Sequence, residues 1–381
     1  MKVGVIMNGV TGRMGTNQHL VRSLLAIRRQ GGIPIPGGEP IWPEPILVGR
    51  SEAKLRALAG EHDLPLWSTD LDACLGDSRF PVYFDAQATS VRVPAVQAAI
   101  EAGKHVYCEK PIASDLGSAL DLVRQAQAVG VKHGVVQDKI FLPGLAKLRR
   151  LRDAGFFGRI LALRGEFGYW VFEGDWQVAQ RPAWNYRAED GGGIVLDMFC
   201  HWNYVLAHLV APVTAVSATA VTHIPERVDE AGKRYRATAD DAAFAIFELE
   251  GGAVAQLNSS WATRVFRSDL LTLQIDGTEG SAVAGLRECW VQHRTTTPRA
   301  VWNPDLPREI DYQRAGWQEV PDNQVFENAF KVQWKLFLRH VACNGSFPWT
   351  LLEGARGVQL AELGLRSSRE RRWLAVPEFE V

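Results

Sequence analysis

The sequence predicts an α/β part with a doubly wound parallel sheet, followed by an α+β part with an open, mostly antiparallel sheet. Its 381 residues amount to about two to three typical domains. Short apolar segments alternate with helical segments up to residue 138, which is typical of parallel sheets. Longer β-type segments joined by short turns then follow, which is typical of antiparallel sheets. We therefore expect one domain over 1–138 and a second over 139–381.

The first domain begins with a short apolar strand over 2–7 and a glycine-rich turn that opens an amphipathic helix. Residues 31–45 contain five prolines and four glycines, so we expect an irregular loop there. The further strands that we expect are 46–48, 82–84, 105–107 and 134–136, and the further helices are 94–102 and 115–129.

The second domain is expected to be rich in strands. The expected strands are 158–170, 213–224, 242–249, 253–261 and 270–275, and the expected helices are 194–209, 325–343 and 351–366. The last two helices are free to pack back on the first domain. The open sheet needs cover on the face that carries Val254, Leu257 and Trp261, so we expect a homodimer or homotetramer built by stacking these faces.

Composition excludes several classes of protein. The chain carries 42 Lys+Arg and 43 Asp+Glu, a net charge of -1, which gives no electrostatic reason to bind nucleic acid or anionic lipid. We find no apolar run of about 18 residues and no secretory leader, so we expect no membrane span. The five cysteines are scattered, without a C-x-x-C pair, which argues against disulfides and structural metal. We expect a cytoplasmic protein.

A glycine motif links the first strand to the first helix. Glycines at such a turn let backbone N–H groups approach a pyrophosphate, which the helix N-terminus favours. The residues that we expect to contact a dinucleotide here are Gly9, Thr11, Gly12, Arg13 and Met14. The alternative is a βα turn that binds no ligand. The alternating strands and helices that follow favour the dinucleotide.

The end of the second strand bears on which dinucleotide is bound. An NAD enzyme usually places a carboxylate there to bind the ribose 2′-hydroxyl. The strand instead ends in Gly49-Arg50-Ser51, and both Arg50 and Ser51 can bind a 2′-phosphate. The sequence therefore favours NADP, with NAD possible. The alternative is that Arg50 merely caps a surface turn.

Two further segments carry groups suited to chemistry. Glu109-Lys110-Pro111 directly follows an expected strand, so Lys110 would enter the crevice at the carboxyl ends of the strands. A glycine triplet over 191–193 precedes a helix on which Asp197 and His201 are four residues apart and share one face. His201 can serve as a general base, and Asp197 can orient it. A helix with one satisfied buried histidine is the alternative. We expect no metal, because Cys200 and His201 lack a third ligand at suitable spacing.

The whole chain resembles the Gfo/Idh/MocA oxidoreductases, a family of glucose–fructose oxidoreductase and inositol dehydrogenase type. The resemblance rests on the glycine motif, on the segment AGKHVYCEKP over 102–111, on Trp184-Asn-Tyr-Arg187, and on the segment from the glycine triplet to His201. It implies an N-terminal Rossmann domain and a C-terminal domain for substrate and assembly. By the resemblance, the cofactor contacts also include Ala88, Thr89, Glu109 and Lys110.

The resemblance also implies an activity, namely hydride transfer between nicotinamide and a sugar, cyclitol or glycoside carbon. Lys110, Asp197 and His201 are then the catalytic set, and His201 takes or gives the proton. Lys110, Asp197, His201 and Arg187 contact the substrate. The alternatives are a glycosidase or lyase that uses transient oxidation by NAD(P), and a non-catalytic ligand-sensing protein of the same fold.

The sequence departs from the family pattern around the substrate pocket. Ala88-Thr89-Ser90 replaces a Thr-Pro-Asn type of turn, Pro94 stands where a histidine is usual, and Tyr204 replaces an acid three residues after His201. Aromatic residues that include Trp170 and Trp176 lie near Glu173 and Asp175, a composition that suits stacking on a polyol. The alternative for these aromatics is an oligomer interface.

Overall fold

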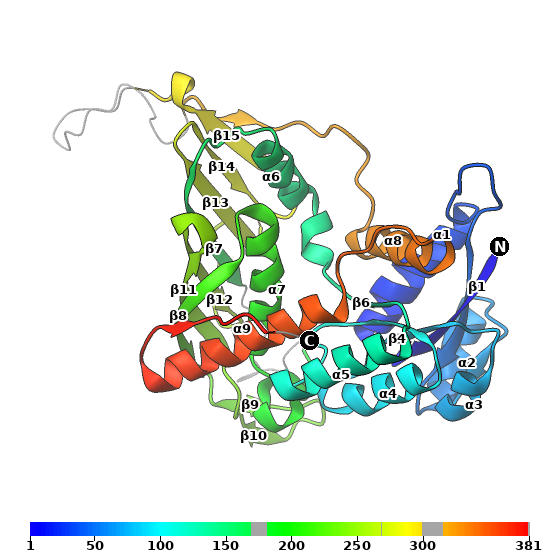
Figure 1. Cartoon of the computed structure of the whole chain (residues 1–381). Helices are drawn as coiled ribbons and strands as arrows, with labels where there is room; N and C mark the ends of the chain where they lie inside the picture. Colours follow the sequence, from blue (N-terminus) through cyan, green and yellow to red (C-terminus); the bar gives the residue numbers. More distant parts are fainter. Residues whose placement is uncertain (169–180, 268, 299–314, 380–381) are drawn as a thin grey trace.

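The computed structural model describes residues 1–168, 181–267, 269–298 and 315–379, and these form two sheets with helices around them (Figure 1). The first sheet is parallel throughout, in the order β3-β2-β1-β4-β5-β6. Its strands are β1 (Lys2–Asn8), β2 (Trp42–Val48), β3 (Trp67–Ser68), β4 (Val82–Asp85), β5 (His105–Cys108) and β6 (His133–Val135). The order reverses between β1 and β4, so the predicted doubly wound Rossmann sheet is confirmed.

Helices cover this sheet. The helix after the glycine turn and those near 94–102 and 115–129 were predicted, whereas two further helices, over 52–61 and 71–76, were not. The helices are η1 (Gly15–Leu24), α1 (Leu25–Arg29), α2 (Glu52–Glu61), α3 (Leu71–Gly76), α4 (Thr89–Glu101) and α5 (Leu116–Val129). The first ten residues of the first helix, η1, form a π-helix, which the periodicity did not indicate. Helix α4 begins at Thr89 rather than at residue 94, and Pro94 lies inside it. Burial of Thr89, Arg92 and Val96 outweighs the preference of proline for a first turn.

Strand β2 is longer than the predicted strand over 46–48, because it begins within the proline-rich segment. Pro43 and Pro45 lie in the strand and pair in register with Val3 and Val5 of β1. On its other side β2 pairs with β3 only through Leu47 and Val48. The prolines therefore lie where β2 is an edge strand, and a proline without an N–H group is tolerated there.

The second sheet is mostly antiparallel, in the order β16-β15-β14-β13-β7-β12-β11-β8-β17, with a parallel pair between β7 and β12. Its strands are β7 (Ile160–Gly168), β8 (Val213–Val221), β11 (Ala242–Leu249), β12 (Val254–Ser260), β13 (Leu271–Gly277), β14 (Gly280–Ala284), β15 (Cys289–His293), β16 (Gln318–Glu319) and β17 (Leu374–Ala375). The predicted α+β architecture is confirmed.

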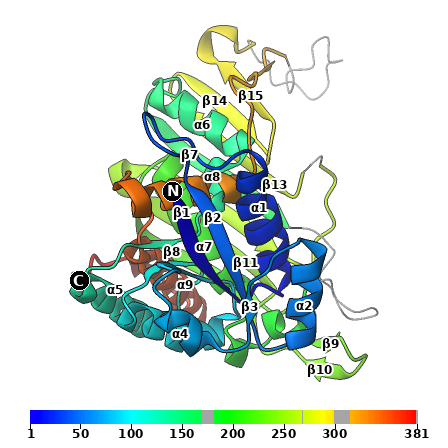
Figure 2. The same ribbon diagram turned by 90° about the vertical axis from the view of Figure 1, so that its right-hand side faces the viewer.

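Three helices, α6 (Pro143–Asp153), α7 (Ile194–Leu209) and α9 (Leu351–Glu370), pack on one face of this sheet (Figures 1 and 2). The short elements are η2 (Asp138–Phe141), η4 (Ala183–Tyr186), η5 (Ala188–Asp190), β9 (Glu226–Val228), β10 (Arg234–Arg236), η6 (Glu250–Gly252) and η7 (Arg294–Thr296). Helix α7 is buried along most of its length and spans the predicted residues 194–209. It packs against both the second sheet and α9, and its first turn carries Asp197 to Lys110 of the first sheet.

Among the described residues, the opposite face of the second sheet carries exposed apolar side chains, and we call it the open face, but these are not all the predicted ones. Leu257 and Trp261 are fully buried, whereas Val254 is exposed. Side chains alternate between the faces of a strand, so Val254 and Leu257, three residues apart, point to opposite faces. Phe244 and Ile246 of β11 share the open face with Val254. The expectation that this face needs cover therefore rests on Phe244, Ile246 and Val254, and not on Leu257 or Trp261.

Helix α8 (Ala329–Cys343) comes late in the chain but packs on the first sheet, beside η1 and α1 (Figure 2). Phe337 of this helix stacks on Tyr107 of β5, and Trp334 packs edge-to-face against the same ring. Helix α8 therefore returns to the first domain, as the sequence left open. The division of the chain at residue 138 stays a prediction. Among the described residues, no helix has the length and apolar character needed to cross a bilayer.

Candidate active site

Lys110 lies at the carboxyl end of β5 and reaches across to the second domain. It directly follows Glu109, and the peptide bond between Lys110 and Pro111 is cis. The Lys110 ammonium forms an ion pair with Oδ1 of Asp197 in the first turn of α7, and Nζ also lies 3.3 Å from the Asp197 carbonyl oxygen. The two predicted catalytic residues are therefore in direct contact, although 87 residues separate them in the chain.

The Asp197 carboxylate has a second cationic partner that the sequence did not indicate. Arg181 donates from Nη1 to Oδ2 of Asp197 at 3.1 Å and to Oδ1 of Asn185 at 3.3 Å. Burial alone would raise the pKa of Asp197, but the charges of Lys110 and Arg181 outweigh it and hold that pKa well below its usual value. Asp197 is therefore ionised, and its negative charge fixes the Lys110 ammonium in the crevice.

His201 lies on the same helix, but a different residue from the predicted one holds its ring. Nδ1 of His201 lies 2.6 Å from the hydroxyl oxygen of Tyr204, while the described bonds of the Asp197 carboxylate run to Lys110 and Arg181. Tyr204, one helical turn later, is the departure from the family pattern noted in the sequence. Burial, and then the charges of Lys110 and Lys139, hold the pKa of His201 well below its usual value. The imidazole is therefore neutral, as a general base requires.

The glycine triplet brings the start of α7 close to both domains. A Cβ on Gly191 would lie 3.1 Å from Cβ of Thr89 at the start of α4, and a Cβ on Gly192 would lie 2.5 Å from the Asn185 carbonyl oxygen. Asp240 accepts from the backbone N–H of Val195 at 2.7 Å, and burial raises the pKa of Asp240 to about 6. The triplet thus allows the backbone to pass beside Thr89, a predicted cofactor contact.

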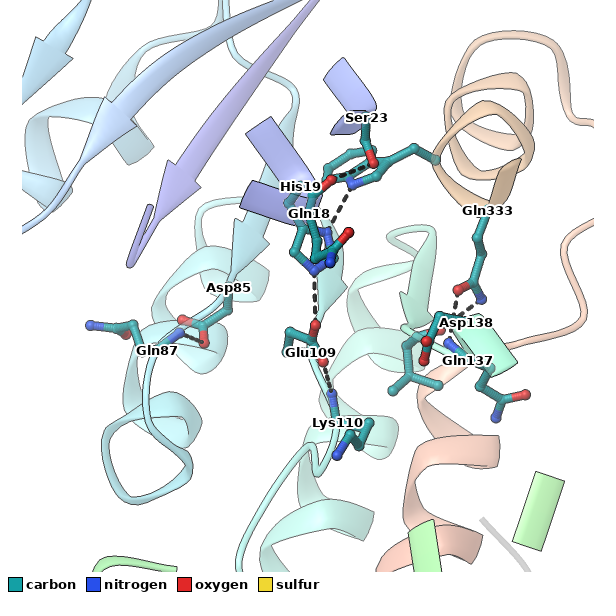
Figure 3. A network of polar contacts seen from close by, with 12 residues as sticks. Gln18, His19, Ser23, Asp85, Gln87, Glu109, Lys110, Gln137, Asp138 and Gln333 are labelled. Carbon is teal, nitrogen blue, oxygen red and sulfur yellow. Dashed lines mark hydrogen bonds and ion pairs between the residues drawn. The ribbon is translucent and has the colours of Figure 1, made fainter. Parts of the chain in front are cut away.

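A buried polar chain supports the Lys110 turn from the side of the first helix (Figure 3). Trp334 donates from Nε1 to Nδ1 of His19 at 3.0 Å, and Nε2 of His19 lies 2.8 Å from Oε1 of Glu109. Because an indole N–H can only donate, Nδ1 of His19 accepts, and the protonated Nε2 donates a hydrogen bond to Oε1 of Glu109. Oε2 of Glu109 accepts from the Lys110 N–H at 3.1 Å. Glu109 therefore positions Lys110, and its predicted contact with a cofactor stays a prediction.

A second buried network holds the same turn from the side of α4. Arg92 donates from Nε to Oδ1 of Asp85 at 2.9 Å, and its Nη1 donates to the Pro111 carbonyl oxygen. Arg92 and Asp85 are 3% and 0% exposed, so the pair is shielded from solvent. This pair could not be predicted from the sequence, because an arginine on a helix is normally exposed.

The residues predicted to hold the dinucleotide gather at the carboxyl ends of β1, β2 and β4. Gly9 has a φ of 75°, and a Cβ on Gly15 would lie 2.7 Å from the Gly9 carbonyl oxygen, so the turn requires both glycines. Thr11, Gly12, Arg13 and Met14 form the rest of this turn, and Ala88 is the residue before α4.

The set of groups at this edge of the sheet fits a dinucleotide. Oε1 of Gln87 is buried beside Gly9 and lacks a hydrogen-bond partner within the described ranges, so it is available to a ligand donor. Arg50 is exposed just after β2, and Oγ of Ser51 accepts from the Lys54 N–H at 3.4 Å as the cap of α2. The glycine turn, Gln87 and Arg50 would together hold the pyrophosphate and the riboses.

The predicted substrate contacts are only partly described. Arg187 lies with its guanidinium carbon 4.8 Å from the centre of the Tyr235 ring, and Ala183, in the same segment, donates its N–H to Oε1 of Glu230 at 2.7 Å. The hairpin formed by β9 and β10 thus supports the segment that carries Arg187. The role of Arg187 in substrate binding stays a prediction. Trp170 and Trp176 lie outside the described residues.

Thiol and metal chemistry receive no support from this site. Burial raises the pKa of the Cys200 thiol to about 12, so Cys200 is a neutral thiol beside His201. Within the described ranges, no three His, Cys, Asp or Glu side chains are arranged to hold a metal ion. Hydride transfer with acid–base assistance is the chemistry for which Lys110, Asp197 and His201 are suited.

Comparison with known proteins agrees with this arrangement. Residues 42–137 match an oxidoreductase family with an NAD-binding Rossmann fold, and residues 145–283 match the GFO/IDH/MocA C-terminal domain. The chain is 57% identical over 383 residues to the D-xylose dehydrogenase of Paenarthrobacter nicotinovorans, covering 100% of this chain and 98% of that protein. The chain belongs to the Gfo/Idh/MocA oxidoreductase family. The resemblance stated from the sequence is therefore confirmed, and this chain is an oxidoreductase.

Two more distant proteins complete the comparison. A 1,5-anhydro-D-fructose reductase of Ensifer adhaerens is 27% identical over 257 residues, covering 66% of this chain and 70% of that protein. Among solved structures, levoglucosan dehydrogenase in complex with NADH and levoglucosan matches with a TM-score of 0.82 and 21% identity, covering 99% of this chain and 100% of that chain. The structural likeness agrees with the fold, in which a Rossmann sheet is joined to an open second sheet.

Proposed function

We propose that this oxidoreductase is an NAD(P)-dependent dehydrogenase of an aldose, with D-xylose as the first candidate substrate. The observation that carries the proposal is the ion pair between Lys110 and Asp197 beside the neutral imidazole of His201. The name of the relative that is 57% identical over the full chain supports the substrate. The proposed catalytic set is Lys110, Asp197 and His201.

Each residue of the set has a separate task in this proposal. A bound nicotinamide supplies the hydride acceptor. Nε2 of His201 takes the proton of the sugar hydroxyl as the C–H bond breaks, because Nδ1 is engaged by Tyr204. The Lys110 ammonium stabilises the negative charge that develops on the hydroxyl oxygen. Asp197 holds the ammonium in place and stays ionised.

The test is a screen for reduction of NAD+ and NADP+ with D-xylose, other pentoses, hexoses, inositols and glycosides. Sugar-dependent accumulation of reduced cofactor, highest with a pentose, is the expected result. Cleavage of a glycoside without net cofactor reduction would instead favour the glycosidase or lyase alternative. Tight sugar binding without turnover would favour the ligand-sensing alternative.

We also propose NADP as the preferred cofactor and a cytoplasmic homo-oligomer as the working form. Arg50 is exposed at the tip of β2, where a 2′-phosphate would lie, and the strand tip carries no carboxylate. Phe244 and Ile246 are 44% and 41% exposed on the open face of the second sheet, which supports a face-to-face assembly. All five cysteines are free thiols, as expected in a reducing compartment.

A further inference from the structure

The Tyr204 hydroxyl occupies a position between the imidazole and a small cavity behind the site. On one side it lies 2.6 Å from Nδ1 of His201, and on another it accepts from the Lys139 N–H at 3.3 Å. For Nε2 of His201 to take a proton from a sugar, Nδ1 must carry the ring proton and donate it to the Tyr204 oxygen. That oxygen then accepts two hydrogen bonds, so its own proton points in a third direction.

Tyr204 also lines a small cavity, which can hold an acceptor for that proton. A cavity of about 10 Å³ borders Tyr204, and the other polar or reactive residues that line it are Lys110, Gln137, Cys200 and Glu353. This volume is at the lower limit for one water molecule. The cavity therefore links the inner side of the site to helix α9.

Two glycines of α9 create this space and bring the helix close to the site. A Cβ on Gly354 would lie 2.7 Å from Cγ2 of Ile112, and a Cβ on Gly357 would lie 3.1 Å from Cα of Cys200. Glu353 precedes Gly354 on the same helix, and its side chain is 26% exposed. Glu353 therefore borders both the buried cavity and solvent.

We propose that Tyr204 and Glu353 form a proton relay, in which the positive charge that His201 would gain in the chemical step passes through Tyr204 and one cavity water to Glu353. The proposal rests on the proposed role of His201 as the base. Neither Tyr204 nor Glu353 touches the reacting carbon in this scheme, so both are positioning and relay residues.

The path balances one proton at each step. The sugar hydroxyl gives its proton to Nε2 of His201 while Nδ1 gives its proton to the Tyr204 oxygen. The Tyr204 hydroxyl passes its own proton to the cavity water, and that water passes one to the Glu353 carboxylate. Glu353 holds this proton during the hydride transfer. When the sugar product has left, Nε2 gives its proton to water in the emptied site and Nδ1 takes one back along the same path, which restores the Nδ1–H ring for the next turnover. Arg356 donates to Oε1 of Glu353 at 2.7 Å and keeps the carboxylate turned along the helix.

The surroundings of Glu353 suit a transient proton acceptor. Burial raises the pKa of its carboxyl above the usual value, and the charge of Arg356 opposes that rise. A carboxylate with a raised pKa holds a proton more readily than an exposed one, as a transient acceptor must.

The test compares Tyr204→Phe and Glu353→Gln in the full-length enzyme with a control, Glu370→Gln. Glu370 lies on the same helix and also pairs with arginines, Arg366 and Arg372, but it is at the far end. We expect both relay variants to lose about tenfold in kcat, a smaller loss than the full contribution of a general base. The KM for the sugar should stay unchanged, and the solvent deuterium isotope effect on kcat should rise. Glu370→Gln should match the wild type.

A chemical rescue distinguishes a relay from a merely structural role. Glu353→Ala opens the cavity to solvent, so added formate should restore kcat in that variant and leave wild-type enzyme unaffected. Wild-type kcat and isotope effect in both Tyr204→Phe and Glu353→Gln, with His201→Ala inactive, would overturn the path while leaving the proposed function intact. If wild-type enzyme reduces no nicotinamide with any sugar, the proposed function fails and the path fails with it.

Discussion

The Lys110 ammonium and the Asp197 carboxylate form an ion pair that joins the end of β5 to the first turn of α7. Each side chain comes from a different domain, and each is mostly buried. The pair therefore fixes the distance between the Rossmann sheet and the helix that carries His201. Substitution of Lys110 and of His201 therefore tests the proposed catalytic set.

Lys110→Met should reduce kcat by about 10²–10³-fold, the range for loss of one donor that stabilises an oxyanion. Cofactor binding, measured by fluorescence titration, should remain close to that of the wild type. His201→Ala should also reduce kcat, and the double variant should lose little more than the worse single, because groups that act as a unit are not additive. Wild-type turnover in a folded Lys110→Met enzyme would remove Lys110 from the mechanism.

The pH dependence should follow the neutral imidazole. Burial and the charges of Lys110, Lys139 and Arg181 hold the pKa of His201 well below 6.5. The base therefore stays unprotonated as pH falls through the ordinary histidine range, so kcat/KM should decline only at lower pH. Lys139→Met removes one facing charge, which raises the pKa of His201 and should move this decline upward in pH. Lys2→Met, at the opposite end of β1, is the control, and an equal shift there would contradict the assignment.

Arg50 should distinguish the two dinucleotides. If Arg50 binds the 2′-phosphate, Arg50→Ala should weaken NADP+ binding by about 1.5–3 kcal/mol, the value of a charged hydrogen bond. NAD+ binding should barely change in the same titration calorimetry. Arg56→Ala removes a comparable arginine from α2 and should affect neither cofactor. Equal losses for both dinucleotides in Arg50→Ala would show that Arg50 has another role.

Trp334 should contribute to stability through His19. Trp334→Phe keeps an aromatic ring but leaves Nδ1 of the fully buried His19 without its donor, which should cost about 1–3 kcal/mol of unfolding free energy. Urea unfolding followed by circular dichroism measures this loss. Trp349→Phe, at a partly buried indole that packs on Phe141, is the control and should cost less. An unchanged unfolding midpoint in Trp334→Phe would show that the bond adds no net stability.

The open face of the second sheet should control assembly. A Phe244→Glu/Ile246→Glu double variant places two charges on that face, and burying them unpaired would be costly. The wild type should show a light-scattering mass of a dimer or tetramer, and the double variant a mass near 42.2 kDa. Val129→Glu, at an exposed position of α5, should leave the mass unchanged. A monomeric wild type would exclude the proposed assembly.

The sequence by itself determined the two-part architecture and most of the predicted site. The alternation of short apolar strands with helices, the glycine turn and the segment from Glu109 to Pro111 depend on local chemistry, which the order of residues encodes directly. Helix α7 also follows from the sequence, since its apolar spacing fixes both ends and places Asp197 and His201 on one side. The extended β2 was missed, because prolines argue against a strand unless the strand is known to lie at an edge.

Only the tertiary structure decided which side chains of the site form hydrogen bonds and ion pairs with one another. Asp197 was expected to orient His201, but long-range folding brings Lys110 and Arg181 to its carboxylate and leaves Tyr204 to hold the imidazole. The same is true of the contact between His19 and Trp334, which are 315 residues apart in the chain. Such pairs depend on how two sheets and the returning helix α8 pack together. Local propensity and spacing carry no information about that packing, because each partner alone is compatible with many other neighbours.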